Sequence, residues 1–180
     1  MRIIGGKFKG RRFTPPADHW PTRPTTDFAK EGLFNILSNS LDFEELKVLD
    51  LFGGTGSHSY ELISRGCTDV TYVDKFGPAV AFARKMARLL EIEPYIKIVQ
   101  SDVFRYITHC KEHYDYIFAG PPYGLPQLEE IPELVFSHAL LRPGGWLVLE
   151  HNPHHSFEAH SCFIMQRNYG KTLFTFFEAP

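Results

Sequence analysis

Short apolar runs alternate with stretches of helical periodicity along most of this chain of 180 residues. Strands that alternate with helices fold into a parallel sheet covered by helices on both faces. The last two runs are separated by Asn168, Tyr169 and Gly170, which suit a hairpin turn, so an antiparallel hairpin is expected at the end of the sheet. We therefore predict an α/β protein with a seven-stranded sheet. The expected strands are 47–52, 70–74, 96–100, 114–119, 145–150, 161–167 and 171–178, and the expected helices are 25–39, 57–65, 78–91, 102–110 and 127–141.

The length and composition are those of one ordinary globular domain. With 43% hydrophobic and 22% charged residues, the chain has enough apolar surface to bury a core. It contains no apolar run of roughly 18 residues and no secretory-type apolar segment after Met1, so neither a membrane span nor a signal peptide is expected. Cys67, Cys110 and Cys162 are odd in number and widely spaced, which argues against a disulfide framework or a zinc site. A reducing, cytoplasmic location is the expectation.

The charge is distributed unevenly. Residues 1–30 carry seven basic groups against two acidic ones, whereas the whole chain has a net charge of −2. We expect a single domain over 1–180, divided into a basic, proline-containing arm at 1–24 and a core at 25–180. A basic arm on an acidic body is typical of a protein that binds an anionic partner, most commonly nucleic acid. The same pattern is also compatible with a terminus that is merely solvated.

Acidic residues lie at or within two residues of the carboxyl ends of three successive expected strands: Asp50, Asp74 and Asp102. Ligands of such sheets bind at the carboxyl ends of the strands, near the point where the strand order switches. A carboxylate in the position of Asp74 can accept hydrogen bonds from both hydroxyls of a ribose, and Asp102 can accept one from an adenine amino group. Taken singly, Asp74 and Asp102 also suit helix caps. Three such strand ends together favour a shared nucleoside pocket.

A glycine-rich turn, residues 53–56, runs out of the first of these strands. It is not a dinucleotide fingerprint, because Gly54 and Gly56 are followed by Ser59 where a third glycine is required. The chain also lacks the lysine-containing glycine loop that binds nucleoside triphosphates. Asp50 beside the turn disfavours a pyrophosphate and tolerates a cationic ligand.

A second turn, formed by Gly120, Pro121, Pro122 and Tyr123, follows the fourth expected strand. The two prolines stiffen the turn and hold its carbonyl groups in one direction. The tyrosine offers a flat ring on which a base can stack. An ordinary proline-rich loop is the alternative, but the position beside the other strand ends favours a functional role.

With these motifs the chain resembles the class I S-adenosylmethionine-dependent methyltransferases, and in particular the RsmD-type enzymes that modify guanine N2 in 16S ribosomal RNA. The resemblance extends over nearly the whole chain. The segments that carry it are 2–11 (RIIGGKFKGR), 23–27 (RPTTD), 30–35 (KEGLFN) and 50–56 (DLFGGTG). It implies a Rossmann-like sheet, S-adenosylmethionine as cofactor and ribosomal RNA or the assembling small subunit as partner, without a membrane or an obligate protein partner.

The resemblance also implies a role for each site residue. The segment 23–27 would cover the cofactor, and the turn at 120–123 would hold the acceptor base. The implied cofactor contacts are Thr25, Thr26, Asp50, Phe52, Gly53, Gly54, Thr55, Gly56, Asp74, Lys75, Asp102 and Val103. The implied catalytic residues are Gly120, Pro121, Pro122 and Tyr123, and the implied RNA contacts are Arg2, Lys7, Lys9, Arg11, Arg12 and Arg23.

The chain departs from the family pattern at Gly120, where these enzymes carry Asp or Asn before the two prolines. An acceptor side chain there holds the hydrogens of the amine and turns its lone pair toward the methyl group. Its loss predicts impaired transfer, and it leaves a weak or silent ribosome-assembly factor that binds cofactor and RNA as the alternative. His151, His154, His155 and His160 lack regular ligand spacing, so no metal site is predicted.

Overall fold

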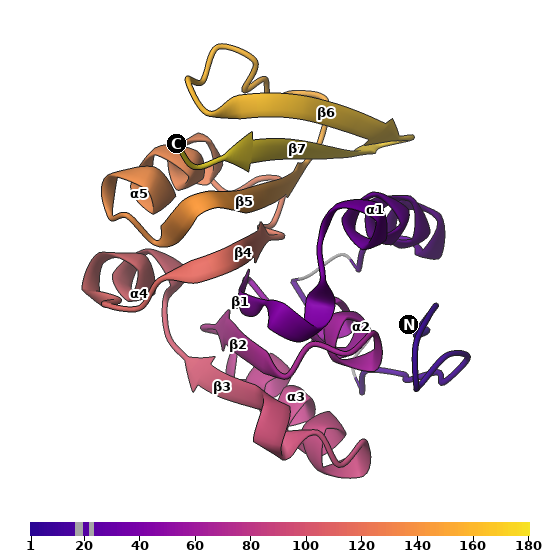
Figure 1. Cartoon of the computed structure of the whole chain (residues 1–180). Coiled ribbons are helices and arrows are strands. Elements are labelled where there is room, and N and C mark those ends of the chain that lie inside the picture. Colours follow the sequence, from indigo (N-terminus) through magenta and orange to yellow (C-terminus); the bar gives the residue numbers. More distant parts are fainter. Residues whose placement is uncertain (17–19, 22–23) are drawn as a thin grey trace.

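The computed structural model describes residues 1–16, 20–21 and 24–180. It contains a seven-stranded sheet with the order β3-β2-β1-β4-β5-β7-β6, in which the first five strands are parallel and β7 runs antiparallel to both its neighbours (Figure 1). The predicted α/β class, the parallel core and the antiparallel C-terminal hairpin are confirmed. None of the helices in this described part has the length and apolarity needed to cross a bilayer.

The strands are β1 (Lys47–Leu51), β2 (Asp69–Asp74), β3 (Ile96–Gln100), β4 (Tyr114–Ala119), β5 (Leu141–His151), β6 (Phe163–Tyr169) and β7 (Thr172–Glu178). The helices are α1 (Asp27–Ser40), α2 (Ser57–Ser64), α3 (Gly77–Leu89), α4 (Val103–His109) and α5 (Ile131–Ser137), with short 3₁₀ turns at Phe43–Glu45, Glu93–Tyr95 and Leu128–Glu130. Helices α1, α2 and α3 cover one face of the sheet, and α4 and α5 cover the other (Figure 1). Each face has its own hydrophobic cluster.

The largest differences from the predicted boundaries lie around the last helix and the strand that follows it. The helix expected over 127–141 is a 3₁₀ turn followed by α5, and the chain leaves the helix at Ala139, which has a φ of 51°. β5 begins earlier than expected because Leu141 already pairs with Tyr114, and the pairing then jumps to Trp146 with Tyr116. The intervening Pro-Gly-Gly sequence is typical of a loop, and the bulge accommodates it within the strand.

The position predicted for the hairpin turn, residues 168–170, is also wrong. Asn168 and Tyr169 belong to β6, and Tyr169 pairs with Thr172, so the turn consists of Gly170 and Lys171. Gly170 has a φ of 72°. Two-residue hairpin loops require such left-handed geometry, because it matches the twist of the flanking strands.

The tip of this hairpin packs on α1. The Tyr169 ring lies so close to Gly32 that a Cβ at position 32 would be 2.2 Å from its Cε1 atom. Phe28, in the first turn of the helix, makes an edge-to-face contact with the same ring at a centroid distance of 5.5 Å. Thr26 caps the helix, since its Oγ1 accepts a hydrogen bond from the Ala29 amide at 3.2 Å. The start of α1 is therefore fixed against the C-terminal strands.

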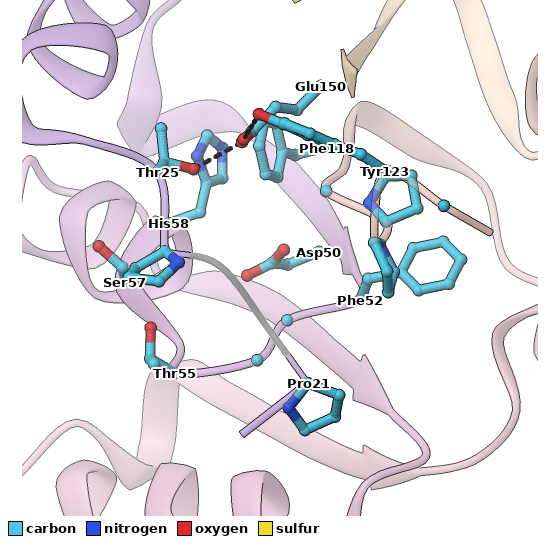
Figure 2. A pocket seen from close by; sticks show the side chains of 17 residues that line it. Pro21, Thr25, Asp50, Phe52, Thr55, Ser57, His58, Phe118, Tyr123 and Glu150 are labelled. Atoms are coloured by element: carbon cyan, nitrogen blue, oxygen red, sulfur yellow. Dashed lines mark hydrogen bonds between the residues drawn. The ribbon is translucent and has the colours of Figure 1, made fainter. Parts of the chain in front are cut away.

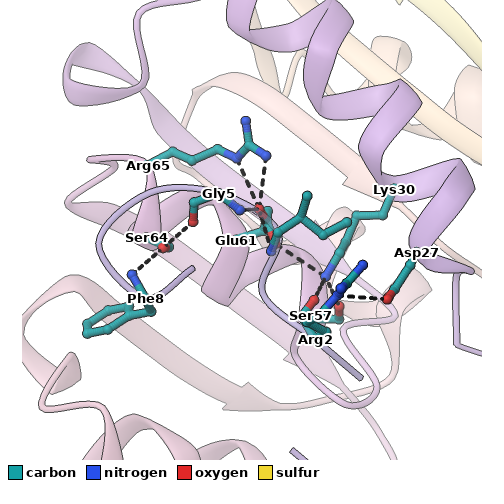
Figure 3. Close-up of polar contacts among 10 residues, drawn as sticks. Arg2, Gly5, Phe8, Asp27, Lys30, Ser57, Glu61, Ser64 and Arg65 are labelled. Atoms are coloured by element: carbon teal, nitrogen blue, oxygen red, sulfur yellow. Dashed lines mark hydrogen bonds and ion pairs between the residues drawn. The ribbon is translucent and has the colours of Figure 1, made fainter. Parts of the chain in front are cut away.

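The basic N-terminal segment is docked on the domain. Its apolar side chains Ile3, Phe8 and Phe13 are buried in the same cluster as α1 and α2. Glu61 of α2 accepts hydrogen bonds from the Ile4 and Gly5 amides at 3.0 and 2.8 Å, and its side chain is wholly buried (Figure 3). The same carboxylate pairs with Lys30 at 3.2 Å and with Arg65 at 3.0 Å. The charged cluster of Lys30, Glu61 and Arg65 thus joins the segment, α1 and α2.

Candidate active site

Two adjoining cavities lie at the carboxyl ends of the parallel strands, where the strand order switches between β1 and β4. The larger has a volume of about 330 Å³ and is lined by Asp50, residues 53–55 of the glycine turn, the turn at 120–123 and Glu150 (Figure 2). The smaller, about 190 Å³, contains Asp74, Asp102, Val103 and Phe104. Their common wall is formed by Pro21, Phe52, Gly120 and Pro122.

The glycine turn is held from beneath by the neighbouring strand. The Gly53 amide donates to the Val73 carbonyl at 3.0 Å, and the Tyr72 hydroxyl donates to the Gly54 carbonyl at 2.7 Å. A Cβ on Gly53 would lie 2.2 Å from the Tyr72 ring, so the backbone approaches that ring as closely as only glycine allows. Phe52, between the two cavities, has a φ of 59°, an uncommon conformation for a bulky residue.

Asp50 is a buried carboxylate at the floor of the larger cavity. It is 1% exposed, and its Oδ2 accepts a hydrogen bond from the Ser59 hydroxyl at 2.6 Å. Burial, together with the charge of Asp74, raises the pKa of Asp50 to about 7. The ionised form is therefore poorly stabilised in the protein alone, and a bound cation would stabilise it.

Binding of S-adenosylmethionine is expected to strengthen about fivefold to tenfold between pH 6 and pH 7.5. In the predicted pose the ammonium group of its methionine part lies beside Asp50 and would favour the ionised carboxylate. A carboxyl with a pKa of about 7 passes from mostly protonated to mostly ionised over this interval. Calorimetry at several pH values measures the effect. Asp50→Asn should remove the pH dependence, whereas Ser59→Ala should move the midpoint upward, because the Ser59 hydrogen bond lowers the pKa. If the affinity of Asp50→Asn depended on pH as the parent's does, the Asp50 carboxylate would be excluded as the source of the pH dependence.

The smaller cavity is lined by the other two acidic residues, Asp74 at the end of β2 and Asp102 after β3. Asp74 accepts hydrogen bonds from the Gly54 amide at 2.9 Å and the Phe76 amide at 2.8 Å, and it is 7% exposed. Asp102 caps α4, since its Oδ1 accepts from the Arg105 amide at 3.0 Å, as the capping alternative expected. Lys75 and Val103 line the same cavity. Both carboxylates thus have a structural role and also line the cavity.

Glu150 connects three segments around the larger cavity. This side chain, at the end of β5 and 5% exposed, accepts hydrogen bonds from the Thr25 hydroxyl at 2.5 Å and the Tyr123 hydroxyl at 2.8 Å (Figure 2). The Tyr123 hydroxyl also lies 3.1 Å from Thr172 Oγ1. Sequence reasoning missed Glu150, although it is an acidic residue at a strand end, which is the signal that identified Asp50.

His58 is a second residue of the cavity that the sequence did not indicate. Its ring stacks on Phe118 at 3.8 Å, and its Nε2 lies 3.0 Å from the Tyr116 hydroxyl. Burial, with a contribution from the Lys30 charge, lowers the pKa of His58 well below its usual value, so the imidazole is neutral at pH 7. Within the described ranges, no three His, Cys, Asp or Glu side chains are arranged to hold a metal ion.

Only some of the remaining predicted site residues line a cavity. Thr25 and Thr55 line the larger cavity, whereas Thr26 and Gly56 lie outside both linings, at the starts of α1 and α2. Arg2 pairs with Asp27 at 3.1 Å. The four other described basic residues of the arm, Lys7, Lys9, Arg11 and Arg12, are exposed. Arg23 lies outside the described residues.

The two cavities fit a nucleoside with a cationic tail. Asp74 and Asp102 line the smaller one beside the apolar surfaces of Val103 and Phe104, which suits a ribose and a base. Asp50 in the larger one suits an ammonium group, and the four residues common to both linings place the two spaces side by side. S-adenosylmethionine has this distribution of charge and shape.

Comparison with known proteins identifies a family, related sequences and similar structures. The family described as Conserved hypothetical protein 95 matches residues 1–178. Ribosomal RNA small subunit methyltransferase D of Escherichia coli is 30% identical over 152 residues, which are 83% of this chain and 71% of the relative. The structure of yhhF from E. coli superposes with a TM-score of 0.85 at 23% identity, covering 99% of this chain and 97% of that one. The structure of the T. thermophilus 16S rRNA N2 methyltransferase RsmC, solved with AdoMet and guanosine, has a TM-score of 0.69 at 24% identity, over 87% of this chain and 44% of that one.

Proposed function

Since the chain belongs to the family of Conserved hypothetical protein 95, the RsmD-type class I methyltransferases, we propose that its rRNA substrate is the exocyclic N2 amine of a guanine in the small subunit. Family membership establishes S-adenosylmethionine-dependent methylation of ribosomal RNA as the general activity. The RsmC structure, which shares the fold, contains guanosine together with AdoMet, and this supports guanine as the acceptor.

The observation that carries the proposal is the wall shared by the two cavities. Gly120 and Pro122 line both the smaller cavity and the larger one, so a base held by this turn would lie next to the bound cofactor. Asp50 would hold the ammonium group, the glycine turn would pass under the methionine part, and Asp74 would hold the ribose. Tyr123 would stack on the base. Holding two reactants in one orientation accounts for much of the rate in such transfers.

The cofactor supplies a methyl group on a positively charged sulfur, which makes that carbon electrophilic. The guanine amine is a poor nucleophile, because its lone pair is delocalised into the ring. In the reaction the nitrogen gains the methyl carbon and releases one proton, while the electron pair of the broken carbon–sulfur bond stays on sulfur. The protein therefore has to turn the lone pair out of conjugation and accept hydrogen bonds from the amine.

Methyl transfer to unmethylated small ribosomal subunits tests the proposal. We expect labelled methyl groups from S-adenosylmethionine to appear as N2-methylguanosine after digestion of the RNA. Label on another base would contradict the choice of guanine N2. The second candidate, a silent assembly factor, is favoured by Gly120 alone; it predicts binding of cofactor and RNA with no transfer to any nucleotide.

The exposed basic residues of the arm are expected to bind RNA phosphates. Replacing Lys7, Lys9, Arg11 and Arg12 by Gln should weaken RNA binding and reduce the slope of log affinity against log salt concentration by about 3, because fewer counterions are released. Fluorescence anisotropy across a salt series measures both quantities. The matched control neutralises four exposed cations of α3 and β3, namely Arg84, Lys85, Arg88 and Lys97. Equal effects of the two sets would mean that the arm has no specific role.

A further inference from the structure

Glu150 presents an acceptor group to the larger cavity. Its carboxylate accepts hydrogen bonds at both oxygens, from Thr25 at Oε2 and from Tyr123 at Oε1, and the residue lines the cavity (Figure 2). The hydroxyl donors belong to the segment before α1 and to the turn after β4, so the carboxylate is held from two sides. An ionised carboxylate is an acceptor only.

The same carboxylate lies beside the glycine that breaks the family pattern. A Cβ built on Gly120 would be 3.9 Å from Glu150 Oε2 and 3.1 Å from Cε1 of the Phe118 ring. The carboxylate oxygens of an aspartate lie two bonds beyond its Cβ. Glu150 therefore brings an acceptor oxygen, from a different strand, close to the region that an aspartate at position 120 would reach.

We infer that Glu150 is the catalytic acceptor for the exocyclic amine of the substrate, a role that rests on the function proposed above. Its Oε2 accepts a hydrogen bond from the amine, which directs the lone pair toward the methyl group. The negative charge stabilises the positive charge that develops on nitrogen, and the released proton passes through this carboxylate to solvent. Thr25 and Tyr123 fix the carboxylate in position, and the absence of a side chain at Gly120 leaves room for the amine beside it.

Replacing the carboxylate tests the inference. Glu150→Met removes the acceptor at similar volume and should slow single-turnover methyl transfer roughly 10²–10⁴-fold. The Kd for S-adenosylmethionine should stay within about threefold of the parent value, because Asp50, Asp74 and the glycine turn are intact. Glu150→Gln keeps an acceptor oxygen and should be at least about tenfold faster than Glu150→Met.

Placing a carboxylate at position 120 instead of 150 distinguishes a catalytic role of Glu150 from a structural one. The double variant Gly120→Asp/Glu150→Met should recover at least about tenfold of the lost rate, since the acceptor returns at the neighbouring position 120. Gly120→Asp alone should gain little, because an acceptor is already present. Thr172→Val, which removes a contact of Tyr123 without touching the carboxylate, should cost less than about tenfold. A large gain in Gly120→Asp alone, or no recovery in the double variant, would overturn the inference and leave Glu150 as a structural anchor.

A second measurement does not depend on turnover. The cofactor-free protein should bind guanosine more tightly than inosine, which lacks the N2 amine, and Glu150→Met should abolish this preference. If the parent chain methylates guanine N2 while Glu150→Met is equally fast, the assignment of Glu150 fails and the proposed function stands. If no chain methylates guanine N2 and the parent does not prefer guanosine, the proposed function fails, and the inference fails with it.

Discussion

Glu61→Gln is expected to lower the free energy of unfolding by about 3–5 kcal/mol, because it leaves the buried ammonium group of Lys30 without its counter-charge. Lys30 is 3% exposed and Glu61 is wholly buried, and their charged atoms are 3.2 Å apart. Burial lowers the pKa of Lys30, and the Glu61 charge opposes this shift. Lys30 also donates hydrogen bonds to the Ser57 hydroxyl at 3.1 Å and to the Arg2 carbonyl.

Denaturant unfolding and thermal melting measure this effect, which corresponds to a fall in Tm of roughly 10 °C for a domain of this size. The Ile4 and Gly5 amides lose their charged acceptor, so their hydrogen exchange should accelerate before the core opens. In Lys30→Met/Glu61→Gln the buried ammonium is gone, and the double variant should be more stable than Glu61→Gln alone. The control is Lys97→Met, which breaks an exposed pair at 3.9 Å and should cost less than about 1 kcal/mol. Similar losses in both single variants would contradict a special role for the buried cluster.

Gly56→Ala is expected to reduce affinity for S-adenosylmethionine by roughly 100-fold and to destabilise the domain by about 3 kcal/mol or more. Gly56 has a φ of 83°, and a Cβ there would lie 2.3 Å from the Tyr60 ring. Tyr60 is wholly buried, so the ring cannot move aside without disturbing the core. The turn must shift instead, which displaces Gly53 and Gly54 on the cavity wall.

Calorimetric titration with S-adenosylmethionine and thermal melting give the two quantities for this variant. Gly77→Ala is the matched control, because the added methyl group would meet only Gln100 Nε2, at 3.5 Å, and the position lines neither cavity. It should leave the affinity within about threefold of the parent value. Normal cofactor binding by Gly56→Ala would show that the turn does not shape the site.

The sheet was predictable because its strands and helices differ in periodicity, and each begins or ends at a residue with a local cause. Thr26 at the start of α1 and Pro78 in the first turn of α3 are examples of such causes. The bulge in β5 was not predictable, because Pro143 and Gly144 have the local character of a loop. They are held in the strand by the pairing of Leu141 and Trp146 with β4 on either side and by the hydrogen bond from the Gly144 amide to the Ala179 carbonyl. Long-range pairing outweighs local propensity there.

The residues of the candidate site likewise include some that the sequence predicted and some that it did not. Asp50 and Asp74 were found because each ends an expected strand and because parallel strands bring their carboxyl ends together. Glu150 also ends a strand, but its importance depends on its distance from Gly120, and that distance depends on the strand order. His58 follows a glycine turn without any periodic signal, and its place in the cavity depends on its contacts with Tyr116 and Phe118 of β4, which are distant in the sequence.

The contact between Gly32 and Tyr169 has an evolutionary consequence. A methyl group at position 32 would lie 2.2 Å from the Tyr169 ring, so a lineage can gain a larger residue in the helix only if the hairpin tip loses bulk. The two positions are expected to have correlated substitution histories among homologues, although they lie far apart in the chain.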